Sequence, residues 1–150
     1  MKNKNILFFG LAVLIIIFDQ LTKFIIKSRL SFSESIPVIK NIFHLTLIKN
    51  FGVGFGLFNA PAARWVLIIL TIIIIGIILY YYKKIPEQYL PVISTSLILG
   101  GAVGNLIDRF LLGFVVDFLD FRVWPAFNVA DSAITIGVIG LIIYFWQSKK

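Results

Sequence analysis

The chain has 150 residues, of which 59% are hydrophobic against roughly 45–50% in soluble domains, and its formal net charge is +7. Its Lys and Arg residues stand singly or in short pairs near the ends of apolar runs, which suits anionic lipid head groups, and we expect no nucleic-acid partner. Because it has no cysteine and only one histidine, His44, the sequence excludes disulfides, a thiolate nucleophile and Cys- or His-rich metal sites.

Four apolar stretches are each about long enough to cross a bilayer. No small-residue cleavage site follows the first, so we interpret it as a retained helix and not as a signal peptide. The four spans are expected at about 6–26, 65–82, 90–107 and 129–146. The sequence therefore predicts an all-α membrane protein with four transmembrane helices in a single domain, 1–150. In the third span, Gly100 and Gly104 form a GxxxG pattern that favours close helix contact.

Two connecting segments, at about 28–63 and 108–128, are too polar to span a membrane. In the first, Phe43, Leu45 and Leu47 alternate with more polar residues, a weak strand signal that predicts a small β-containing segment on the membrane surface. His44 is interpreted as a surface strand residue. The glycine-rich NFGVGFG sequence at 50–56 follows, and we expect the region from Gly52 to Phe58 to form a short amphipathic lid.

An even number of spans places both termini on the same side of the membrane. Lysines and arginines are equally frequent on the two faces, so the charge rule alone gives a tie. We favour cytoplasmic termini because Lys83 and Lys84 in the short KKIPEQY connection lie directly against a span end, as do the terminal lysines.

Several polar residues interrupt the apolar stretches and need partners at membrane depth. Asp19 and Lys23 lie one helical turn apart with the acid first, which favours a structural ion pair. Asn105 and Asp108 share a helix face, and Arg109 compensates an acid near a helix C-terminus. For Asp108 and Arg109, bracing of the neighbouring loops and direct contact with a substrate remain open alternatives.

Two carboxylates, Asp117 and Asp131, bracket one short connection at the edge of the apolar chain. Asn128 and Asp131 alone have a structural explanation as the cap and third residue of a helix N-terminus. Asp117, however, lies in what we take as a loop, at even spacing from the apolar residues Leu119 and Phe121. Asp120 lies at even spacing from a basic residue and is expected to be solvated or salt-bridged. A carboxylate at a position that alternates with apolar residues needs a reason, and a second carboxylate across the loop provides one. The pair indicates acid/base chemistry.

Taken together, these residues resemble the lipoprotein signal peptidase family, signal peptidase II, an intramembrane aspartic peptidase family of bacteria. Five motifs carry the resemblance across nearly the whole chain: FDQLTK at 18–23, NFGVGFG at 50–56, GGAVGNLIDR at 100–109, VVDF at 115–118 and FNVAD at 127–131. Gly54 departs from the pattern, since the family more often has alanine there.

The resemblance implies catalytic aspartates at Asp117 and Asp131. It further implies that the site is lined or braced by Asn50, Gly52, Asn105, Asp108, Arg109 and Asn128. Asp19 and Lys23 would be structural polar residues. No metal or cofactor is implied.

The implied substrate is a prolipoprotein carrying a diacylglyceryl-modified cysteine, cleaved just before that cysteine. The implied location is the bacterial cytoplasmic (inner) membrane, where the chain contacts membrane lipids and the active site lies near the outer face. The resemblance also implies sensitivity to globomycin. The oligomeric state stays open, with a monomer favoured. Two rival classes are an ion-coupled carrier, for which no internal repeat is visible, and a non-catalytic membrane assembly factor.

Overall fold

A computed structural model describes residues 3–52 and 63–148. In these residues the elements, in chain order, are α1 (Lys4–Arg29), β1 (Ser35–Ile39), β2 (Phe43–Asn50), α2 (Ala63–Tyr81), the 3-10 helix η2 (Tyr82–Lys84), α3 (Tyr89–Leu111), β3 (Val115–Asp120) and α4 (Val129–Gln147). The four α-helices are long and apolar enough to cross a membrane, which confirms the expected number. The expected lid lies outside the described residues, except for Gly52.

The helices form a bundle in which α3 is by far the most buried. Glycines let its backbone approach α1 and α4 closely. A Cβ atom on Gly100 would lie 2.7 Å from the Ala12 carbonyl oxygen of α1, and one on Gly101 would lie 2.4 Å from the Ala130 carbonyl oxygen of α4. A Cβ atom on Gly104 would meet the carboxylate of Asp19. The expected close contact through Gly100 and Gly104 is therefore confirmed, and it is made with α1.

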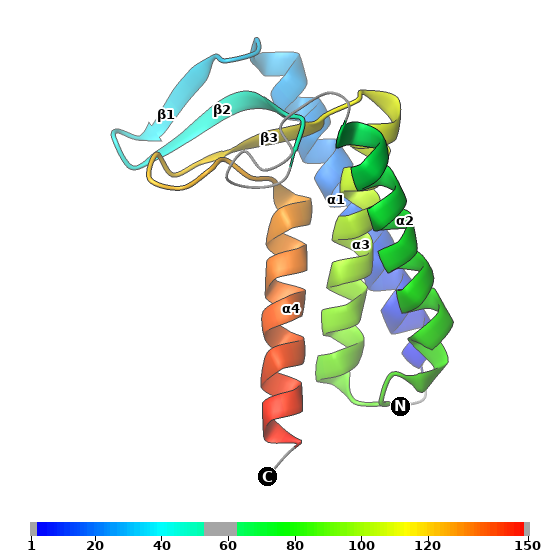
Figure 1. The fold of residues 1–150 in the computed structure, drawn as a ribbon. Coiled ribbons are helices and arrows are strands. Elements are labelled where there is room, and N and C mark those ends of the chain that lie inside the picture. The colour runs from blue at the N-terminus through cyan, green and yellow to red at the C-terminus, as the bar shows by residue number, and fades with distance from the viewer. Residues whose placement is uncertain (1–2, 53–62, 149–150) are drawn as a thin grey trace.

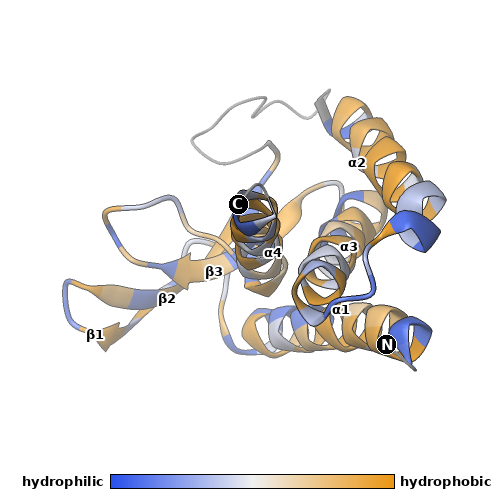
Figure 2. Cartoon of the chain, turned by 90° about the horizontal axis from the view of Figure 1, so that it is seen from below, coloured by the Kyte–Doolittle hydropathy of each residue, from blue (hydrophilic) through white to orange (hydrophobic). Residues whose placement is uncertain are grey.

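The outward faces of the helices are predominantly hydrophobic, as Figure 2 shows in a view along the bundle. Without a driving force between apolar surfaces in lipid, such helices associate through close packing and interhelical polar contacts. At the end of the bundle below the sheet, polar contacts connect α1, α3 and α4.

A small antiparallel sheet with the order β1-β2-β3 lies at that end of the bundle. Both termini point toward the opposite end (Figure 1). The strand signal at Phe43 to Leu47 is confirmed as part of β2. The segment that contains Asp117 was expected to be a loop, and this expectation is wrong: it forms β3, which pairs with β2 so that Asp117 lies opposite Ile48 and Val115 opposite Asn50. The pairing joins segments far apart in the sequence, which local patterns do not reveal.

Candidate active site

The N-terminus of α4 fixes the position of Asp131. Asn128 is the N-cap: its side-chain oxygen accepts a hydrogen bond from the Asp131 backbone N–H at 2.9 Å. The Asp131 carboxylate in turn accepts from the Asn128 backbone N–H at 3.3 Å, which completes a capping box. The structural explanation of this pair is therefore confirmed, and the cap leaves the other carboxylate oxygen of Asp131 for a different partner.

Asp117 is buried in β3, with 1% of its surface exposed, and both of its carboxylate oxygens accept hydrogen bonds from amides. Asn128 Nδ2 donates to one oxygen at 2.7 Å and Asn50 Nδ2 to the other at 2.8 Å. Burial raises the pKa of Asp117 to about 7, and the negative charge of Asp131 acts in the same direction, while the two amide hydrogen bonds oppose the rise. Asp117 therefore holds a proton at a pH where an ordinary aspartate is ionised.

Two asparagines connect the carboxylates. Asn105 on α3 donates from Nδ2 to Asp131 at 2.8 Å, and its side-chain oxygen accepts from Asn128 Nδ2 at 3.1 Å. Because Asn128 also donates to Asp117, a continuous chain of hydrogen bonds runs from Asp117 through Asn128 and Asn105 to Asp131. The two carboxylates thus belong to one polar network.

A second layer of charges supports this network from α1. Lys23 Nζ lies 2.8 Å from Asp19, as the sequence spacing predicts, and 3.0 Å from Asp108. It also donates to the side-chain oxygen of Asn105 at 3.1 Å. Asp19 accepts from the backbone N–H of Ala130, next to Asp131, at 3.0 Å. A buried lysine is thereby paired on two sides, as a charge at this depth requires.

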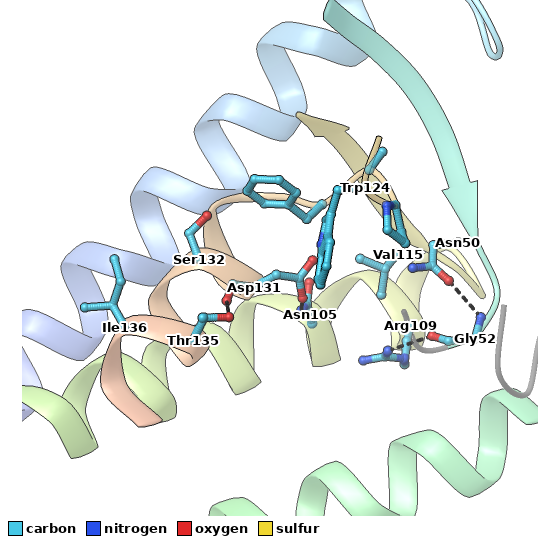
Figure 3. A pocket seen from close by; sticks show the side chains of 13 residues that line it. Asn50, Gly52, Asn105, Arg109, Val115, Trp124, Asp131, Ser132, Thr135 and Ile136 are labelled. Carbon is cyan, nitrogen blue, oxygen red and sulfur yellow. Dashed lines mark hydrogen bonds between the residues drawn. The ribbon is translucent and has the colours of Figure 1, made fainter. Parts of the chain in front are cut away.

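A cavity of about 520 Å³ opens beside the network (Figure 3). Its lining contains Asp131 together with three expected support residues, Asn50, Gly52 and Asn105. Arg109 also lines it and donates to the Gly52 carbonyl oxygen at 3.2 Å. The remaining lining residues are Val115, Trp124, Pro125, Ala126, Phe127, Ser132, Thr135 and Ile136.

Residues that are neighbours in one sequence motif have different surroundings in the structure. Asp108 is buried among Lys23, Gln20 and the backbone N–H of Val116, whereas Arg109 reaches the cavity. Within the described residues, Asp117 lies outside the cavity lining and connects to it through Asn50. Asp120 is salt-bridged to Arg122 at 3.0 Å, which confirms one of its two expected states.

Sequence reasoning missed Gln20 and the cavity wall formed by 124–127. Gln20 Nε2 donates to Asp19, Asp108 and the Gly104 carbonyl oxygen. Its signal was visible as an amide directly after Asp19 in an apolar helix. Nothing in the local pattern of 124–127 marks these residues as a wall.

Comparisons with known proteins show the family of this chain. The family model described as Signal peptidase (SPase) II matches residues 11–147. A lipoprotein signal peptidase of Halothermothrix orenii is 46% identical over 139 residues, which cover 93% of this chain and 94% of that protein. One of Moorella thermoacetica is 46% identical, covering 93% and 91%.

A bacterial membrane enzyme whose structure was determined by the in meso method at 2.3 Å resolution is 36% identical, with a TM-score of 0.87. The alignment covers 93% of this chain and 87% of that one. The family model and these relatives span nearly the whole sequence, and the solved structure has the same fold. The chain therefore belongs to the signal peptidase II family.

Proposed function

We propose that this chain is an aspartic endopeptidase that removes signal peptides from prolipoproteins, cleaving just before a diacylglyceryl-modified cysteine. Membership of the signal peptidase II family supports the peptidase activity, and its relatives carry the name lipoprotein signal peptidase. The observation that carries the catalytic assignment is the hydrogen-bonded chain from Asp117 through Asn128 and Asn105 to Asp131, beside the cavity.

In the proposed mechanism the two aspartates share one proton. The raised pKa of Asp117 supports this, because two nearby carboxylates resist simultaneous ionisation. The charged carboxylate takes a proton from water, and the water oxygen attacks the scissile carbonyl carbon. The protonated carboxyl donates a hydrogen bond to the carbonyl oxygen. The tetrahedral intermediate then collapses as the leaving amine takes up a proton. The first proton transfer belongs to the pair as a unit.

The neighbouring polar residues position this pair. Asn50, Asn105 and Asn128 hold the carboxylates through their amide groups. Asp19, Lys23 and Asp108 brace the N-terminus of α4 and the amide of Asn105. We assign Arg109 and Gly52 to substrate contact, because both line the cavity.

We further propose that the termini are cytoplasmic and that the site faces the outer side of the cytoplasmic membrane. The sheet and cavity lie at the end of the bundle opposite both termini, so cytoplasmic termini would place the site on the outer side (Figure 1). A site at this depth would let the acyl chains of a lipid-modified substrate remain in hydrocarbon while the peptide enters the cavity.

The test is cleavage by the purified protein in vesicles. A diacylglyceryl-modified precursor should yield a mature lipoprotein of the expected mass, and the same precursor with an unmodified cysteine should not. Absence of cleavage, together with Asp117-dependent solute uptake by the vesicles, would instead identify a carrier.

A further inference from the structure

Residues 121–127 connect β3 with α4, and the second half of this loop, 124–127, forms one wall of the cavity. We propose that this loop selects the substrate, with Trp124 contacting an apolar substrate group and Asp120 acting as the positioning residue that holds the loop. The inference rests on the proposed function, because it places a peptide substrate in the cavity.

The lining of the cavity is divided by chemistry. Four consecutive loop residues, 124–127, contribute uncharged side chains, of which Trp124 is the largest. The carboxylate and amides come from Asp131, Asn105 and Asn50 (Figure 3). A scissile amide needs the polar groups, so the apolar groups of a bound substrate are left to pack against the loop and against Val115 and Ile136.

Asp120 holds the start of the loop in a conformation that is rare for its sequence. Arg122 has a φ of +65°, although it is not glycine, and the Val123 N–H donates to the Phe121 carbonyl oxygen at 2.7 Å, as in a strained γ-turn. One Asp120 oxygen accepts from the Arg122 backbone N–H at 2.8 Å. The other accepts from the Arg122 guanidinium at 3.0 Å and from the Thr46 hydroxyl at 2.8 Å. The carboxylate therefore fixes both backbone and side chain of the strained residue.

The other end of the loop is fixed by Phe127. Its N–H donates to the Leu119 carbonyl oxygen at 3.1 Å, and its carbonyl oxygen accepts from Leu119 and Phe118. Its ring stacks on Phe121, with 5.9 Å between the centroids. Since both ends are held, the loop presents Trp124 from a preformed base, which lowers the cost of ordering it around a substrate.

An indole wall recognises an apolar, uncharged group. In a lipid-modified peptide this chemistry has two sources: a side chain next to the scissile bond, or an acyl chain of the glyceride. In either case the substrate would lose affinity if the indole were removed. The two sources are distinguished by changing one of these groups at a time in the substrate.

The first experiment compares Trp124→Ala with Val123→Ala in the cleavage assay with the lipidated precursor. Val123 is 94% exposed and lies outside the cavity lining in the described part of the chain, so it is the matched control. We expect Trp124→Ala to raise KM about tenfold or more, the order expected for a lost apolar contact, with kcat unchanged and with no effect in the control.

Two substrate series then identify the group. Shortening the acyl chains, or replacing the apolar side chain before the cysteine by alanine, should remove the difference between wild type and Trp124→Ala in one of the two series. A difference that persists in both would overturn the assignment of Trp124 to an apolar substrate group.

The second experiment tests Asp120. Asp120→Ala should raise KM as Trp124→Ala does, without moving the pH dependence of kcat. Asp120→Asn should raise KM less, because its one amide oxygen can still accept from the Arg122 backbone N–H, although its NH2 group cannot accept from the guanidinium. A shifted pH profile would place Asp120 in the catalytic pair and contradict its proposed role. Equal KM values for Trp124→Ala and Val123→Ala, with normal wild-type cleavage, would overturn the inference alone; absence of wild-type cleavage would refute the proposed function.

Discussion

Asp117 is buried and accepts two amide hydrogen bonds, yet burial and the nearby charge of Asp131 raise its pKa to about 7. The ordinary value of 3.8 would leave it ionised throughout the physiological range. The two opposing influences leave Asp117 able to gain or lose a proton near neutral pH, which is what a general acid or base requires.

This shift has a consequence for the pH dependence of activity. Below about pH 7 the pair retains its shared proton and can act as acid and base together. Above pH 7 the proton is lost, leaving two carboxylates and no donor for the carbonyl oxygen. We expect kcat/KM to fall about tenfold per pH unit on the alkaline side, with a midpoint near pH 7. A flat profile between pH 6 and 9 would contradict this account.

The sequence revealed individual site residues better than their connections. Asp117 and Asp131 stand out because a carboxylate in an apolar chain is costly and therefore conspicuous. The role of Asn128 as a helix cap follows from local spacing. Its donation to Asp117 and Asn105 could not be predicted, because it depends on how β3 and α3 meet α4 in space.

At the scale of the secondary-structure elements, Asn128 combines two tasks that mutation can separate. Its oxygen caps α4, and its amide nitrogen bridges Asp117 and Asn105. Asn128→Ser keeps a good cap but loses the bridge, whereas Asn128→Ala loses both. We expect both variants to lose activity at least about tenfold, since a buried carboxylate loses its hydrogen bond at a cost of about 1–3 kcal/mol.

Only Asn128→Ala should show the additional loss of about 1 kcal/mol in stability that removal of a cap produces. Thermal unfolding in detergent measures it. Wild-type activity in Asn128→Ser would show that the bridge is dispensable.

The contact of α3 with α4 sets the position of Asp131. Gly101→Ala would place a methyl group 2.4 Å from the Ala130 carbonyl oxygen, so α4 must move at the turn that carries Asp131. We expect a loss of about 1–3 kcal/mol in stability, together with reduced kcat. Gly10→Ala and Gly76→Ala are matched controls, because a Cβ atom at either site meets nothing within 4 Å. If Gly101→Ala behaves like the controls, close packing does not position the site.

The elements differ in how far the sequence reveals them. Hydrophobic length is a local property, so the number of apolar helices follows from it directly. The strands β1 and β3 are short, and each is stabilised by pairing with β2, which is distant from β3 along the chain. Neither strand has a pattern strong enough to be predicted without its partner.

At the scale of the whole molecule, the orientation in the membrane can be tested with introduced cysteines. The chain contains no cysteine, so maleimide labelling of a single introduced cysteine has no background from other thiols of the chain. Val123→Cys lies in the loop after β3 and Lys84→Cys in η2, at opposite ends of the bundle (Figure 1). We expect a membrane-impermeant maleimide to label Val123→Cys in intact cells and Lys84→Cys only after permeabilisation. The reverse pattern would place the site on the cytoplasmic side.

Catalysis by the proposed mechanism requires Asp117 and Asp131 to act as one unit. Cleavage of the lipidated precursor by Asp117→Asn, Asp131→Asn and the double variant tests this directly, with folding of each variant checked by thermal unfolding. We predict that each single variant loses about 10³-fold or more in kcat, and that the double variant loses no more than the singles. A single variant with activity within tenfold of wild type, or losses that multiply in the double variant, would contradict the shared mechanism.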